Sequence, residues 1–260
     1  MASSSPMRIP AGFTQDTSFQ PLGMLGVPNP FFYAKFADDF MHYNVDDYTV
    51  TANTNGGVAQ TVGGVGGRIT FTTNSSTPLA ADITAVQSVS ATVLMAATKK
   101  TAWLARIQAA SITAPVLQIG LMQETVTPAT IVTGMLATRA HSATAWVFQM
   151  VVGSTVVGSA TVTDAVSGYA ANTDIDLAMV YTGRGGANGA GQTYGDVLCY
   201  IGSNLVGQIL DQNRATLGPM ARFNPTSIPA AVMAPTLAMQ SGAAASTTMI
   251  ADFLFAAQER

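Results

Sequence analysis

Charged residues are scarce in this 260-residue chain. The 11 Lys and Arg and 14 Asp and Glu make up 10% of the sequence, less than half of the usual ~25%. Apolar residues make up 48% of the sequence, too many to remain exposed to water. This excludes a charge-rich disordered chain. Eleven scattered cations form no basic stripe, so nucleic acid is not an expected partner. So neutral a surface favours a subunit covered by partners over a free monomer.

Cysteine and histidine are almost absent too. Cys199 is the only cysteine, which excludes an intrachain disulfide, and its apolar run, Val197–Ile201, predicts a small buried residue rather than a nucleophile. The two histidines, His42 and His141, lie far apart in the sequence and match no zinc-ligand spacing. The sequence contains no Gly-x-Ser-x-Gly elbow. We therefore expect no catalytic residues, no metal, no cofactor and no enzymatic activity.

Long apolar runs are missing as well. The chain has no stretch of about 18 uninterrupted apolar residues, so no transmembrane helix and no membrane partner are expected. The polar start, Met1–Ser5, is not followed by an apolar segment of the kind found in secretion signals.

What the chain does contain is strand-like sequence from about residue 31 onward. Thr, Val, Ile and aromatic residues recur in runs of five to nine, separated by Gly, Asn, Ser and Pro, and helical periodicity is weak. This pattern predicts an all-β protein, a jelly-roll or concanavalin-like β-sandwich forming a single domain over residues 31–260. The predicted strands are Tyr48–Ala52, Arg68–Thr73, Ile83–Leu94 (with a break near Ser88), Ala102–Ala109, Val116–Met122, Thr144–Val151, Thr155–Val162, Ile175–Thr182, Asp196–Ile201, Leu205–Leu210, Ala231–Met239 and Thr247–Phe255.

Residues 1–30 have a different character. Repeated Pro and Gly forbid a regular helix and fit poorly in a central strand. Large apolar residues nevertheless occur between them, and a solvated tail would have no use for these. We expect an extended N-terminal arm that lies on its own domain or on a neighbour, the alternative being a partly ordered leader. The candidate partner-binding residues of the arm are Phe13, Phe19, Leu22, Met24 and Leu25.

Two glycine-rich segments suggest phosphate-binding loops at first sight. Gly63–Gly67 is followed by a predicted strand rather than by the helix that such a loop requires. Gly183–Gly191 fails for the same reason. Both are therefore predicted to be loops between strands, and a contact loop is a further interpretation of the second.

Neighbouring carboxylates are the remaining candidates for chemistry. The pairs Asp38-Asp39 and Asp46-Asp47 cannot act as dyads, because adjacent residues of a strand point to opposite faces. Asp174 and Asp176 share a face and are better placed, but no third ligand or general acid follows from the spacing. Turn capping is the favoured role of all these carboxylates. For the aromatic residues Trp103, Trp146 and Phe148, core packing is favoured over a carbohydrate platform.

Several segments, in their order along the chain, resemble one known family. These are Phe36–Phe40, Gly67–Phe71, Lys99–Ile107, the hairpin Tyr200–Val206 and the final strand beginning Asp252-Phe253. The pattern is similar to that of the decoration, or cement, proteins on the heads of tailed bacteriophages, which have a concanavalin-like jelly roll.

The resemblance implies a structural virion protein that stabilises a capsid shell through neutral contacts and its N-terminal arm. The implied partners are the major capsid protein and further copies of the chain, as a dimer or trimer at local symmetry axes. The implied location is the outer surface of the capsid, after assembly in the host cytoplasm. A lectin-like carbohydrate-binding module of a phage tail or host-recognition protein is the alternative. A glycoside hydrolase of the same fold would need two carboxylates about 5–9 Å apart, and no such pair is readable in the sequence.

Overall fold

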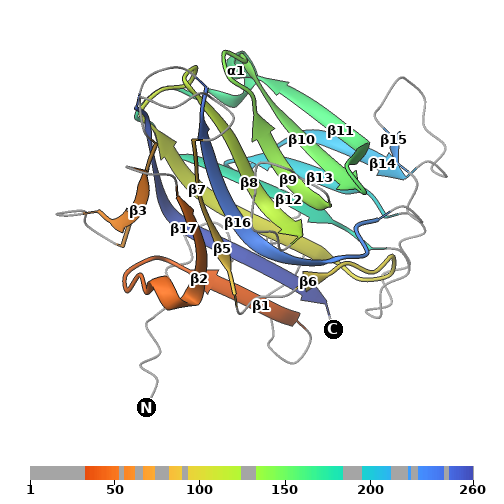
Figure 1. Cartoon of the computed structure of the whole chain (residues 1–260). Helices are drawn as coiled ribbons and strands as arrows, with labels where there is room; N and C mark the ends of the chain where they lie inside the picture. Colours follow the sequence, from red (N-terminus) through yellow and green to blue (C-terminus); the bar gives the residue numbers. More distant parts are fainter. Residues whose placement is uncertain are drawn as a thin grey trace.

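The chain forms two β-sheets that pack face to face (Figure 1), and all strand pairs except β14–β15 are antiparallel. The structure, a computed structural model, describes residues 33–52, 56–61, 67–73, 82–89, 93–123, 133–183, 195–211, 222–223, 228–242 and 246–259. The predicted arm residues Phe13, Phe19, Leu22, Met24 and Leu25 lie outside these ranges, as does most of both glycine-rich segments.

One sheet has nine strands, in the order β15-β14-β13-β12-β7-β17-β4-β3, with β1 also paired to β17. Because β17 is long, its first half pairs with β4 and its second half with β1, while β7 lies along its other edge. The strand bounds are β1 (Tyr33–Asp38), β3 (Gly57–Gln60), β4 (Ile69–Thr72), β7 (Thr101–Ala109), β12 (Ile175–Tyr181), β13 (Val197–Ile201), β14 (Asn204–Asp211), β15 (Arg222–Phe223) and β17 (Thr248–Glu259).

The other sheet has eight strands, in the order β11-β10-β9-β8-β16-β5-β2, with β6 also paired to β16. Its strands are β2 (Tyr48–Ala52), β5 (Ile83–Ser88), β6 (Val93–Leu94), β8 (Pro115–Gln123), β9 (Gly134–Arg139), β10 (Ala145–Val152), β11 (Thr155–Thr163) and β16 (Val232–Ser241). Two short helical turns, η2 (Val45–Asp47) and α1 (Asp164–Ser167), complete the described elements. Among the described residues, no helix is long and apolar enough to span a membrane.

The core lies between the sheets and follows from strand alternation. On β7, Trp103, Ala105 and Ile107 point into the core, whereas Leu104 and Arg106 point to the opposite face. Trp146 and Phe148 on β10 meet the core from the other sheet and are fully buried. The expectation that these aromatic residues pack in the core is confirmed.

The predicted fold class is confirmed, and most predicted strands match observed ones closely. The predicted break near Ser88 separates β5 from β6. The predicted hairpin joins β13 to β14, where Gly202 takes a positive φ of 59°, a conformation that suits glycine. The sequence patterns did not reveal β1, β3, β9 and β15.

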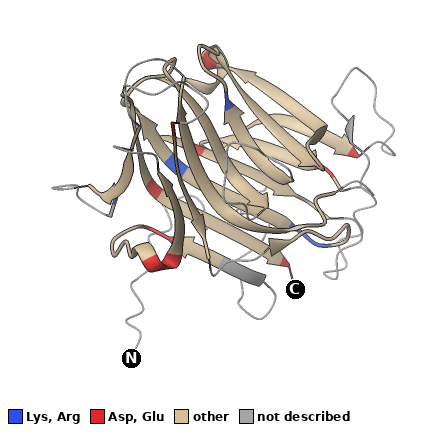
Figure 2. Ribbon diagram, in the orientation of Figure 1, with Lys and Arg blue, Asp and Glu red and all other residues tan. Residues whose placement is uncertain are grey.

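Charge is sparse over the described ribbon (Figure 2). Arg139 on β9 is fully buried, and its Nε donates to the carbonyl of Ile112 at 2.9 Å. Its two Nη atoms bind the carboxylate of Asp164 at 2.5 and 2.8 Å. The guanidinium also lies over the rings of Tyr169 and Trp146, at 5.1 and 5.9 Å from their centroids. This cation is part of the packed interior.

Candidate functional site

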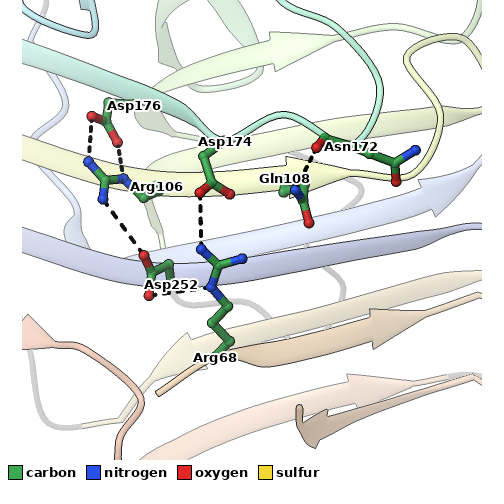
Figure 3. A network of polar contacts seen from close by, with 7 residues as sticks. All are labelled: Arg68, Arg106, Gln108, Asn172, Asp174, Asp176 and Asp252. Atoms are coloured by element: carbon green, nitrogen blue, oxygen red, sulfur yellow. Dashed lines mark hydrogen bonds and ion pairs between the residues drawn. The ribbon is translucent and has the colours of Figure 1, made fainter. Parts of the chain in front are cut away.

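A network of charged side chains lies on the outer face of the nine-stranded sheet (Figure 3). Its members lie on, or directly before, four neighbouring strands, in the order β12, β7, β17 and β4. At ~4.8 Å per strand, the network spans about 14 Å across the sheet. It contains two arginines and three aspartates: Arg68, Arg106, Asp174, Asp176 and Asp252.

The pair formed by Arg106 and Asp176 has the shortest contacts of the network. These residues are register partners on β7 and β12, so their side chains stand on the same face of the sheet. Arg106 Nε and Nη2 donate to the two oxygens of Asp176 at 2.6 and 2.9 Å. A bidentate pair of this kind fixes the planes of both groups. The bond to Asp176 is the main reason that the pKa of Arg106 is raised.

Arg68, which directly precedes β4, forms the second ion pair. Its Nη2 lies 3.0 Å from Oδ2 of Asp174, the residue before β12. Asp252 lies between the two arginines, 3.8 Å from Arg68 Nε and 3.8 Å from Arg106 Nη1. Asp252 therefore connects the two pairs into one network (Figure 3).

A β-bulge places Asp252 on this face. In the pairing of β17 with β7, Ala251 is opposite Ile107 and Phe253 is opposite Arg106, so Asp252 is the extra residue. Ala251 and Leu254 both belong to the inter-sheet core, which leaves Asp252 and Phe253 together on the outer side. Bulges often re-aim a side chain in this way next to functional sites.

Neutral hydrogen-bonding groups extend the network along β7. Gln108 lies two residues beyond Arg106, on the same face, and its Nε2 donates to the backbone carbonyl of Asn172 at 2.7 Å (Figure 3). Asn172 lies two residues before Asp174, so this hydrogen bond adjoins the network. The outer face thus offers carboxylate, guanidinium and amide groups side by side.

Solvent reaches the network without fully exposing it. The side chains of Arg106 and Asp252 are 28% and 20% exposed, and that of Asp174 is 41% exposed. Three carboxylates against two guanidiniums give the network a formal charge of −1, which disfavours an anionic ligand. Asp176 and Asp252 contact one guanidinium at 2.6 and 3.8 Å, so their oxygens lie within about 9 Å of each other.

The outer face of the eight-stranded sheet is chemically different. Its described strands contain no Lys, Asp or Glu, and their one charged residue, Arg139, is buried. Among the described strands, carboxylate chemistry on a sheet face is therefore restricted to the nine-stranded sheet.

The other candidates from the sequence have structural roles. Asp38 and Asp39 accept hydrogen bonds from the backbone N–H groups of Phe40 and Met41 and so cap a turn, as expected. Cys199 is fully buried, and burial raises the pKa of its thiol. His42 lies in the turn that follows β1 and His141 in the turn that follows β9. Neither belongs to the network.

The sequence analysis placed Asp174 and Asp176 on one face but favoured turn capping as their role, and it missed the arginines and the aspartate with which they form ion pairs. Two of the missed residues, Arg106 and Asp252, have a signal in the sequence. Arg106 is the one charged residue within β7, and Asp252 is the first of only two in β17. In a chain with so few charges, a charge inside an apolar strand needs a partner on the same face.

Comparison of the whole fold with solved structures shows what the architecture is similar to. An endo-1,3-β-glucanase from Streptomyces sioyaensis matches with a TM-score of 0.56 and 11% identity, over 88% of this chain and 98% of the glucanase. The chain shares its fold with β-glucanases. A lichenase from a mouse hindgut metagenome has a TM-score of 0.54 and 10% identity, over 85% and 98% of the two chains. A Bacillus licheniformis β-glucanase has a TM-score of 0.54 and 13% identity, over 85% of this chain and 97% of the glucanase.

These neighbours have the same jelly-roll fold as this chain. At 10–13% sequence identity, the likeness establishes the fold alone. No family model matches the sequence, and no curated protein matches it. The concanavalin-like part of the resemblance noted above is therefore right.

The comparison contradicts the expected function. The three structures described above are glucanases, which contradicts the expectations of a capsid-decoration protein and of a protein without enzymatic activity. The physical reason is that a neutral, hydroxyl- and amide-rich surface on a jelly roll suits contacts with sugar hydroxyls as well as contacts with other subunits. Low charge alone could not distinguish the two.

Proposed function

We propose that the protein binds a neutral, β-linked glucan on the outer face of its nine-stranded sheet, at the network of Arg68, Arg106, Asp174, Asp176 and Asp252. The observation that carries the proposal is the convergence of these five side chains from four neighbouring strands, in a fold shared with β-glucanases.

The chemistry of the network suits sugar hydroxyl groups. A carboxylate accepts a hydrogen bond from a hydroxyl, whereas a guanidinium or an amide donates one to it. The bidentate Arg106–Asp176 pair holds a donor and an acceptor in fixed positions, so binding costs little ordering of side chains. The net negative charge of the network favours a neutral polymer over an acidic one.

Hydrolysis of the bound glucan is a second candidate, favoured by the spacing of two carboxylates. Glycosidases place two carboxyl groups roughly 5–10 Å apart, and the shared contacts with Arg106 keep Asp176 and Asp252 within the upper limit of that range. Asp176 is held by two short bonds, whereas the contacts of Asp252 with both guanidiniums are longer. Asp252 is accordingly the carboxylate to replace first.

Binding is tested with soluble β-1,3-glucan and β-1,3-1,4-glucan, by affinity electrophoresis and calorimetry. The variants are Asp252→Asn and Arg106→Ala, and Asp46→Asn is the control because this exposed aspartate lies in η2, outside the network. A lost charged hydrogen bond is worth about 1.5–3 kcal/mol, so affinity should fall roughly 10- to 100-fold in the first two variants only.

Release of reducing sugar from the same polymers tests hydrolysis. Activity that Asp252→Asn abolishes and Asp46→Asn leaves intact would support the second candidate. Binding of neither glucan by the unaltered protein would contradict the proposed function. So would equal binding by all the variants, provided that their circular dichroism and melting temperatures show them to be folded.

A further inference from the structure

An apolar cluster occupies the other half of the same sheet face. It is formed by residues of β7, β12, β13 and β17 whose side chains point away from the inter-sheet core. Its larger members are Leu104, Val180, Leu198, Tyr200, Phe253 and Phe255. Phe253 and Phe255 lie two residues apart on β17 with stacked rings, 6.4 Å between centroids. We call this the outer apolar cluster.

The outer apolar cluster is buried although it belongs to the outer side of a sheet. Phe255 is 2% exposed, Phe253 4% and Tyr200 1%. Within the described part of the chain, Ala37 is the one partly buried apolar residue that packs against the cluster from outside it. Alanine is too small to cover several aromatic rings, so the apolar residues of the described ranges leave most of this burial unexplained.

We propose that the N-terminal segment, residues 1–32, covers the outer apolar cluster of its own chain. The segment continues directly into β1, which runs beside β17 with Ala37 opposite Phe255. It therefore enters the sheet next to the surface that needs a cover.

The segment has the length and composition for this role. Thirty-two extended residues span about 100 Å, whereas the five strands from β1 to β13 span about 19 Å. Its prolines keep it out of regular strand pairing, so it would lie across the face rather than extend the sheet. Its large apolar residues, Phe13, Phe19, Leu22, Met24 and Leu25, would contact the cluster. Burial of apolar area on both sides would stabilise the contact.

This cover would end where the charged network begins. Phe253 belongs to the outer apolar cluster and Asp252, its neighbour at the bulge, to the network. On β7, likewise, Leu104 belongs to the outer apolar cluster and Arg106 to the network. The inference rests on the burial of the cluster and does not depend on what the network binds.

Photo-crosslinking in the full-length protein tests which segment covers the cluster. Phe255 is replaced by p-benzoylphenylalanine, and Leu198, at the margin of the cluster with 9% exposure, is replaced in a second variant in case the first fails to fold. The expected products have the mass of one chain and join the labelled position to peptides from residues 1–32. Crosslinks to another segment would overturn the proposal, and so would a product of twice the chain mass, which would identify a second copy as the cover.

A fluorescence measurement gives an independent readout. Replacing Phe13, Phe19, Leu22, Met24 and Leu25 by Ser in the full-length chain should uncover the cluster, so the fluorescence of the apolar dye ANS should rise several-fold. The matched control replaces Thr14, Gln15, Thr17 and Gln20 by Ser in the same segment and should leave the fluorescence unchanged. Equal fluorescence of the two variants would also overturn the proposal.

Discussion

Arg106 and Asp176 face each other directly across two neighbouring strands and form a bidentate ion pair, with Nε and Nη2 of the arginine 2.6 and 2.9 Å from the two carboxylate oxygens. The pair joins β7 to β12 on the side of the sheet that faces away from the core. Asp252, brought to the same side by a bulge, then connects the pair to Arg68. The site is thus a product of strand register as much as of residue type.

The Arg106–Asp176 pair predicts a specific effect of a conservative substitution. Arg106→Lys keeps the charge but removes one of the two parallel hydrogen bonds, because an ammonium group cannot reproduce the planar fork of a guanidinium. The unfolding free energy should fall by about 0.5–1.5 kcal/mol, the net worth of one hydrogen bond. Urea unfolding of both proteins at pH 7 measures the difference.

The control for this effect is Lys100→Arg, a change of cation outside the network. It should leave the urea midpoint almost unchanged. An Arg106→Lys variant as stable as the unaltered protein would show that the second hydrogen bond is replaced by water at no cost.

Strand alternation was sufficient to predict part of this site. It placed Asp174 and Asp176 on one face, and the predicted strand Ala102–Ala109 contains Arg106. It could not bring Asp252 to Arg106, because the pairing of β17 with β7 joins residues almost 150 positions apart and contains a bulge. Neither feature has a signal within a local window of sequence.

The missed strands have local causes. β1 contains Lys35 and Asp38 and lacks a clear alternation of apolar and polar residues. β3 is four residues long and begins with Gly57, a residue that is depleted in strands. The function was misjudged for a different reason: the scarcity of charge describes a neutral surface but does not say what touches it.

The buried cation Arg139 should be the most sensitive charged position in the described part of the chain. Its guanidinium is fully buried and binds both oxygens of Asp164 and the carbonyls of Ile112 and Ala143. Arg139→Met leaves these acceptors without their donor. Breaking a buried ion pair from one side typically costs about 3–5 kcal/mol, so the melting temperature should fall by about 10 °C.

Two further variants test the cause of that loss. Arg68→Met removes a partly exposed cation and should cost less than about 1 kcal/mol. Adding Asp164→Asn to Arg139→Met should destabilise less than the sum of the single changes, since the two residues form one pair. Fully additive effects would contradict the assigned pairing.

Cys199 should be unreactive in the folded protein. Its side chain is fully buried on β13, and burial raises the pKa of the thiol, so neither access nor thiolate is available for thiol exchange. Ellman's reagent at pH 8 should label the thiol rapidly in 6 M guanidinium chloride and at least 100-fold more slowly in buffer. The chain has a single cysteine, so the signal has one source. Rapid labelling of the native protein would show that β13 opens readily to solvent.

Tyr169 predicts a measurable loss of stability in alkali. The side chain is 5% exposed beside Arg139 and Trp146, and burial, against the opposing effect of Arg139, raises the pKa of its hydroxyl to about 12. In the unfolded chain the same hydroxyl ionises near pH 10. Between these values the unfolded state loses the proton while the folded state keeps it, so the unfolding free energy falls as the pH rises. Tyr169 contributes about 1 kcal/mol of this loss at pH 11.

The matched variant is Tyr169→Phe. Among the residues that the structure describes, the hydroxyl has no hydrogen-bond partner, so its removal should be neutral or slightly stabilising at pH 7. At pH 11 the variant should exceed the unaltered protein by about 1 kcal/mol more than it does at pH 7, because it lacks the ionisable group while all other tyrosines are common to both. Urea unfolding at pH 7, 9 and 11 gives the two curves, and curves that stay parallel up to pH 11 would show that Tyr169 ionises as readily in the folded protein as in the unfolded chain.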